Sequence, residues 1–122
     1  MRGLSLLGAA GLIVAAGAAN AADAGRGETL FVECASCHSI ERGVEGVGPT
    51  LFGLFQRKAG EVPDYRYSPA LKRSGIAWTP QTLDTYIADP QKIVPGNRMP
   101  YSGMTNAQDR ADLIAYLEKS AK

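Results

Sequence analysis

The apolar residues near the end of the chain recur at helical spacing, three and four positions apart. Such a stripe is wide enough to be the buried face of a helix. Residues 105–108, Thr-Asn-Ala-Gln, fit a capping box in which Thr105 is the N-cap. The pattern predicts a closing helix after Thr105, with a buried stripe of Leu113, Ile114, Tyr116 and Leu117.

Two shorter helices are predicted in the middle of the chain, each starting with a hydroxyl residue followed by proline. Ser68-Pro69 and Thr79-Pro80 both place an N-cap before a proline at the first helical position. Gly75 would stop the first helix, and Asp89-Pro90 would end the second. The apolar face of the second helix consists of Leu83, Tyr86 and Ile87.

A further helix is expected near the start, capped by Asp23 and running through residues 26–37, with Leu30 and Phe31 on its apolar face. The glycine-rich residues 41–50 that follow favour irregular structure. Few stretches show the alternation of apolar and polar residues that a strand requires. The chain therefore reads as an all-α domain whose long loops need something to pack around.

The first 21 residues differ from the rest of the chain. Arg2 is their only charged residue, and an apolar Gly/Ala-rich run leads to the small-x-small sequence Ala19-Asn20-Ala21. These features are typical of a secretory signal peptide, so we expect cleavage near Ala21 or Ala22 and a single domain over residues 22–122. An uncleaved anchor is the alternative, although the apolar run is shorter than the roughly 20 residues of a membrane span.

Charge and composition exclude some classes of function. The chain has 13 Lys and Arg residues against 12 Asp and Glu, and loss of Arg2 with the signal leaves 12 of each sign. A neutral domain lacks the basic face that binding to nucleic acid requires. Export would also place the domain in an oxidising compartment, where disulfides persist.

Both cysteines and the one histidine of the chain lie together in Cys34-Ala35-Ser36-Cys37-His38. A thioredoxin-like redox motif is disfavoured because no strand or βαβ pattern precedes it. A structural zinc site is disfavoured because there is no second pair of cysteine or histidine ligands. The remaining interpretation is covalent attachment of haem through Cys34 and Cys37, with His38 as proximal iron ligand.

The second axial ligand of such an iron is not fixed by the residue count. There is no second histidine, and Met1 would leave with the signal, so Met99 and Met104 are the two thioether candidates. Met104 directly precedes the predicted cap of the last helix, where an apolar residue often packs on the helix start. Chemistry alone leaves both methionines open.

From Gly27 to Lys119 the chain resembles a class I cytochrome c of the mitochondrial and bacterial c2-like type. The stretches that carry the resemblance are CASCH, GPTLFGLFQRKAG (residues 48–60), residues 65–99 and the last helix. The resemblance implies a cytochrome c fold, with three main helices plus short helices and loops wrapped around one haem c. It also implies that Met99, in Pro-Gly-Asn-Arg-Met, is the axial ligand opposite His38.

Further site residues follow from the same resemblance. Pro49 would accept the His38 ring N–H through its carbonyl, and Tyr86 would face the haem and bond the Met99 sulfur. The haem propionates would be surrounded by Arg57, Tyr67, Trp78 and Asn97. Gly27 and Phe31 would pack where the terminal helices cross.

Three positions depart from the family pattern. Leu71 stands where many relatives carry an asparagine near the haem. Glu33 precedes Cys34, and Gln91 follows Pro90, where a lysine is frequent. The ring of lysines through which mitochondrial relatives dock therefore has fewer members here, and Lys92, Arg98 and Arg42 remain as candidate contacts. With a neutral domain, we expect electron transfer to depend weakly on salt.

The resemblance implies a soluble, monomeric, periplasmic carrier of single electrons and no enzymatic activity. It would pass electrons from a membrane complex or dehydrogenase to an oxidase or reductase of a respiratory or photosynthetic-type chain. It would not insert into a membrane once its signal is cleaved. One alternative is a dedicated haem subunit of one dehydrogenase or reductase, held at the membrane by an uncut N-terminus. A haem peroxidase or gas sensor, which requires a dissociating Met99, and a haem-free thiol oxidoreductase are others.

Overall fold

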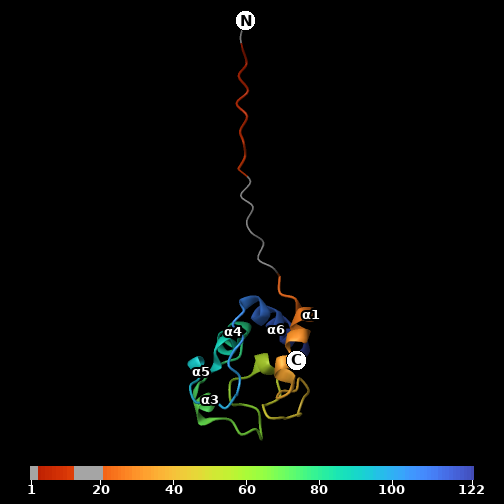
Figure 1. The fold of residues 1–122 in the computed structure, drawn as a ribbon, viewed down its shortest axis with the longest axis vertical. Helices are drawn as coiled ribbons and strands as arrows, with labels where there is room; N and C mark the ends of the chain where they lie inside the picture. Colours follow the sequence, from red (N-terminus) through yellow and green to blue (C-terminus); the bar gives the residue numbers. More distant parts are fainter. Residues whose placement is uncertain (1–2, 13–20) are drawn as a thin grey trace.

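The computed structural model describes residues 3–12 and 21–122, and the described part beyond residue 21 is a helical domain (Figure 1). No strand occurs among these residues; one isolated antiparallel bridge joins Lys58 and Ala77. The all-α prediction is confirmed. The elements in chain order are α1 (Ala24–Leu30), α2 (Val32–Ala35), the 3-10 helix η1 (Leu54–Gln56), α3 (Pro69–Arg73), α4 (Pro80–Ala88), α5 (Pro90–Ile93) and α6 (Ala107–Ser120).

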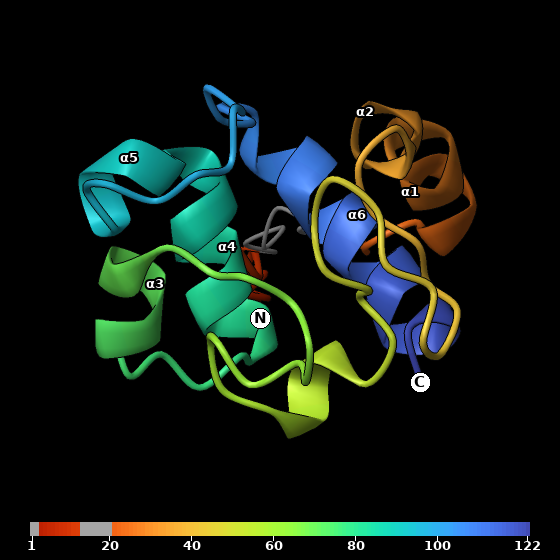
Figure 2. The ribbon, with the colours of Figure 1, turned by 90° about the horizontal axis from the view of Figure 1, so that it is seen from below.

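The terminal helices α1 and α6 lie side by side, which both ribbon views show (Figures 1 and 2). Gly27 makes this approach possible, because a Cβ on that residue would lie 1.9 Å from the backbone oxygen of Asp112. The rings of Phe31 and Tyr116 meet at the same crossing, with centroids 5.5 Å apart. The predicted packing of Gly27 and Phe31 against the last helix is therefore present.

The two predicted middle helices form as their caps require. The Ser68 side chain accepts a hydrogen bond from the backbone N–H of Leu71 at the start of α3. Thr79 and Thr82 cap α4 reciprocally, each hydroxyl accepting from the other residue's backbone N–H. The apolar face of α4 is buried in the core, where its members are Leu83, Tyr86 and Ile87.

Three local features differ from the sequence expectation. The first helix is divided at Phe31 into α1 and α2. The N-cap of α6 is Asn106 rather than Thr105, because the Asn106 side chain accepts from the backbone N–H of Asp109. Asp89-Pro90 ends α4 as predicted but also starts α5, with the Asp89 side chain as N-cap and Pro90 at the first helical position.

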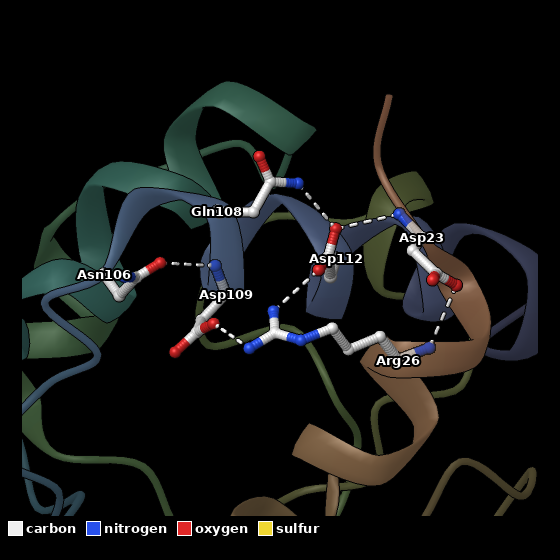
Figure 3. A network of polar contacts seen from close by, with 6 residues as sticks. All are labelled: Asp23, Arg26, Asn106, Gln108, Asp109 and Asp112. Atoms are coloured by element: carbon white, nitrogen blue, oxygen red, sulfur yellow. Dashed lines mark hydrogen bonds and ion pairs between the residues drawn. The ribbon is translucent and has the colours of Figure 1, made fainter. Parts of the chain in front are cut away.

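A polar network that the sequence did not reveal joins α1 to α6 (Figure 3). The carboxylate of Asp112, only 1% exposed, accepts hydrogen bonds from the Asp23 backbone N–H at 2.8 Å, from the Arg26 guanidinium at 2.8 Å and from the Gln108 amide at 2.9 Å. Arg26 also pairs with Asp109 at 2.6 Å. These donors hold the pKa of Asp112 below its usual range, the Asp23 N–H being the largest cause.

The predicted signal peptide is only partly covered by the structure. Residues 1–2 and 13–20 lie outside the described residues, whereas residues 3–12 are exposed and have no regular secondary structure. Within the part of the chain that is described, no helix has the length and apolar character of a membrane span. Cleavage near Ala21 or Ala22 stays a prediction.

Candidate haem-attachment site

Cys34 lies in α2, and Cys37 and His38 lie in the turn that follows this helix. The backbone N–H groups of Cys37 and His38 both donate to the carbonyl of Cys34, at 3.0 and 2.9 Å. This turn holds the three residues in one compact segment. Cys34 and Cys37 are free thiols, and both are half-buried.

The environment of Cys34 keeps its thiol protonated at neutral pH. Burial is the main cause that raises the pKa of Cys34 to about 11, and the charge of Glu33 adds to it. Cysteines that exchange disulfides have the opposite property, because a lowered pKa generates the attacking thiolate. The structure thus gives no support to the thiol oxidoreductase alternative. Among the described residues, no cluster of three or more His, Cys, Asp or Glu side chains offers a zinc site either.

His38 is held as a neutral imidazole with one nitrogen committed to the protein. Its Nδ1–H donates to the carbonyl of Pro49 at 2.7 Å, the contact expected of Pro49. Because a carbonyl only accepts, the neutral ring must leave Nε2 unprotonated, the form that ligates a metal. Burial lowers the pKa of His38 and so favours the same neutral form.

Gly48 lies against one side of this ring. A Cβ on Gly48 would lie 2.3 Å from Cε1 and 2.7 Å from Nδ1 of the imidazole, closer than any real contact. The Gly48 N–H also donates to the Cys37 carbonyl at 2.8 Å, which ties this loop to the cysteine turn. The backbone of the glycine-rich loop therefore fixes the orientation of His38 without a side chain.

The two candidate methionines have different surroundings. Met104 is 6% exposed, belongs to the hydrophobic core and follows Gly103 toward α6. Met99 is half-buried at the edge of that core. Its backbone N–H donates to Oδ1 of Asn97 at 2.8 Å. Met104 thus packs as an ordinary core residue, whereas the Met99 side chain is less buried and is the better candidate for an iron ligand.

Asn97 is an organiser of the loop before Met99. Its Nδ2 donates to the carbonyls of Pro90 and Val94, both at 3.0 Å, and both amide hydrogens are thereby used. Donation to a propionate, the role expected of Asn97, would require one of these bonds to be released. That role stays a prediction, and the structure gives Asn97 a second one in placing Met99.

The remaining predicted residues are buried or half-buried. Trp78 and Tyr86 are in contact edge to face, with ring centroids 5.1 Å apart, and burial raises the pKa of Tyr86 to about 12. The Tyr67 hydroxyl accepts from the Val62 N–H at 3.0 Å. No hydrogen bond joins Tyr86 to Met99 among the described residues, and the expected bond to that sulfur stays a prediction.

Arg57 is a half-buried cation without a carboxylate partner among the described residues. Its guanidinium donates to the carbonyls of Phe52 and Thr50, and burial lowers its pKa. A buried cation in this position favours the approach of an anionic group. Its two carbonyl bonds leave further N–H donors of the guanidinium for such a group, which suits the expected contact with a haem propionate.

The positions that depart from the family pattern also have structural roles. Leu71 packs at the edge of the core in α3. The Gln91 amide donates to the Asn97 carbonyl at 3.0 Å and accepts from the Gly96 N–H. Glu33 accepts a hydrogen bond from the Tyr101 hydroxyl at 2.9 Å. The sequence offered no signal for this last pair, because its members lie 68 positions apart.

The donor set fits a covalently bound haem. Two thiols and an imidazole with a free Nε2 lie within five positions of the chain, a thioether lies in a separate loop, and Arg57, Trp78 and Tyr86 are buried or half-buried in the same domain. Thioether bonds to Cys34 and Cys37 would tether the haem, and His38 would ligate its iron.

Comparisons with known proteins agree with this site. The family model for cytochrome c matches residues 24–121. Cytochrome c2 of Rhodopila globiformis is 48% identical over 103 residues, covering 84% of this chain and 97% of its own, and cytochrome c of Gibberella zeae is 45% identical over 102 residues, covering 82% and 96%. The solved structure of cytochrome cH from Methylobacterium extorquens superposes with a TM-score of 0.75 at 44% identity, covering 80% of this chain and 98% of its own. The chain therefore belongs to the cytochrome c family, whose members bind haem c covalently and carry electrons rather than act as enzymes.

Proposed function

We propose that this protein carries single electrons through a haem iron ligated by His38 and Met99. The observation that carries the proposal is the His38 ring, whose Nδ1–H is bound to Pro49 and whose Nε2 is left as the free nitrogen. Met99 supplies the second ligand because Met104 is part of the hydrophobic core.

This ligand pair explains why electron transfer, rather than catalysis, is the activity. When bound, haem c supplies an iron centre that gains and loses one electron. With His38 and Met99 both bound to it, that iron would have no position left for oxygen, peroxide or a substrate. The protein holds both ligands in place through Pro49 and Asn97, so that the site changes little between oxidation states.

We further propose that the chain works in the periplasm, after cleavage of residues 1–21. The charge, apolar run and small-x-small sequence of that segment support export. Its partners would be redox proteins, with a membrane complex or dehydrogenase as donor and an oxidase or reductase as acceptor. A mass measurement on protein isolated from the periplasm tests this: a mature start at Ala22 is expected, and an intact Met1 contradicts it.

The ligand assignment is tested by a matched pair of substitutions, Met99→Leu and Met104→Leu. Leucine has nearly the volume of methionine but no sulfur, so both variants keep their packing. We expect Met99→Leu to lose the far-red absorption band of the sulfur–iron bond in the oxidised protein and Met104→Leu to retain it. The reverse result would assign the ligand to Met104. A pyridine haemochrome spectrum of each variant establishes that covalent haem is still present.

A further inference from the structure

The segment that would supply the methionine ligand, residues 97–101, is here named the methionine loop. Its start is anchored by Asn97, which is bonded to two carbonyls of α5 and the residue after it and also accepts the Met99 N–H. Gln91 reinforces this anchor from the exposed side. Beyond the loop, the Met104 N–H donates to the Ile87 carbonyl at 2.8 Å. Met99 thus lies between two fixed points.

The end of the methionine loop has one further attachment, which joins it to a segment 68 positions away in the sequence. The Tyr101 hydroxyl donates to Oε2 of Glu33 at 2.9 Å. Within the described residues, this is the only hydrogen bond between the methionine loop and the segment of residues 31–38. Glu33 is the residue directly before Cys34, so the bond connects the loop to the start of the attachment motif.

The geometry transmits this attachment to Met99 over a short path. The Tyr101 N–H donates to the Met99 carbonyl at 2.8 Å, so that residues 99–101 form one tight turn. Tyr101 is half-buried and packs at the edge of the core, which limits the freedom of its ring. Holding the hydroxyl of Tyr101 therefore holds the backbone of Met99 as well.

We propose that Glu33 and Tyr101 are positioning residues that latch the methionine loop to the haem-attachment segment and keep Met99 on the iron. The inference rests on the proposed ligation by Met99. It gives a role to Glu33, which stands where relatives frequently carry a lysine. A lysine there would serve docking, whereas the Glu33 carboxylate accepts a hydrogen bond from the Tyr101 hydroxyl. The departures at Glu33 and Gln91 then share one consequence, because each braces the methionine loop, from opposite ends.

If Glu33 and Tyr101 hold the methionine loop in place, an outside ligand should replace the Met99 sulfur more easily once their hydrogen bond is removed. Imidazole is a suitable probe for the oxidised, haem-loaded protein, because it is small, largely neutral above its pKa and binds iron only when the methionine loop opens. A net hydrogen-bond contribution of ordinary size corresponds to a change in an equilibrium constant of about threefold to tenfold. Tyr101→Phe and Glu33→Ala should each raise the imidazole association constant by that factor.

Two control variants separate the latch from general effects. Tyr65→Phe also removes one hydroxyl from a half-buried ring. That hydroxyl donates to the Val47 carbonyl at 2.7 Å and not to the attachment segment, so this variant should leave imidazole binding unchanged. Glu33→Gln removes the charge but keeps an oxygen that accepts from Tyr101, so it should lie close to the unchanged protein. The double variant Tyr101→Phe/Glu33→Ala should bind imidazole no more tightly than the stronger single variant, because both substitutions break the same bond.

The proposal is overturned if Tyr101→Phe and Glu33→Ala bind imidazole as Tyr65→Phe does, or if their effects multiply in the double variant. Failure of the ligand assignment has a different signature. In that case the unchanged protein lacks the far-red sulfur band, or Met99→Leu keeps it. A measurement of the urea midpoint on the same variants, expected to match that of Tyr65→Phe, shows that the change in binding comes from the loop and not from global unfolding.

Discussion

The approach of α1 to α6 depends on the missing side chain of Gly27, and the substitution Gly27→Ala tests this. The added Cβ would lie 1.9 Å from the Asp112 carbonyl oxygen, 2.6 Å from its carbonyl carbon and 2.9 Å from Cβ of Tyr116. Ordinary contact begins at 3.4 Å, so the helices must separate by up to 1.5 Å. The nearest two atoms belong to the backbone of a helix and cannot turn aside as a flexible side chain would.

The magnitude follows from three contributions. Overpacking against backbone costs about 3 kcal/mol, the upper part of the usual range. Separation of the helices weakens the aromatic contact between Phe31 and Tyr116, at about 1 kcal/mol. Alanine returns about 1 kcal/mol through its better helix propensity. The net loss in the free energy of unfolding is about 3 kcal/mol.

Urea denaturation of the haem-loaded protein, followed by far-ultraviolet circular dichroism, measures this loss. With an m-value of about 2 kcal/mol/M, the midpoint should fall by about 1.5 M. Gly25→Ala is the matched control in the same helix, because its Cβ would meet only the end of the Asp23 side chain at 3.3 Å. If both variants unfold within about 0.5 kcal/mol of each other, the error to be expected of such estimates, the close approach of α1 and α6 is refuted.

Three further predictions concern the imidazole, the buried carboxylate and the surface charge. Gly48→Ala should displace the His38 ring and lower the fraction of low-spin haem in visible spectra. An unchanged spectrum would contradict the role of Gly48 in fixing the orientation of that ring. The pKa of Asp112 is lowered in the folded state, so its contribution to stability is fully present above the ordinary aspartate pKa of about 3.9 and is lost as pH falls through the lower folded value. Asp112→Asn should therefore flatten the acid side of a plot of urea midpoint against pH, and a slope equal to that of the unchanged protein contradicts this. With 12 charges of each sign after residue 21, the rate of reduction of hexacyanoferrate(III) should change less than about threefold between low and physiological salt, and a steep decline would refute weak steering.

Local signals in the sequence were sufficient for the starts of α3 and α4 and for the attachment motif. A cap acts within three or four residues, which is why Ser68, Thr79 and their prolines mark the starts of α3 and α4 correctly. Competing caps one position apart are harder to separate: α6 begins at Ala107, and Asn106 rather than Thr105 accepts from the N–H three residues on, that of Asp109. The aspartate before Pro90 served two helices at once, which a rule for ending helices did not reveal.

The sequence by itself determined the chemistry: two thiols and an imidazole in five positions, two methionines downstream, and helices whose apolar faces must meet. Only the tertiary structure decided which distant residues join. It brought Asp23 and Arg26 to the buried Asp112, and Glu33 to Tyr101. Spacing along a chain encodes contacts within a turn or a helix, whereas a hydrogen bond between residues 68 or 89 positions apart depends on how the helices pack, because packing alone sets the distance between its two atoms.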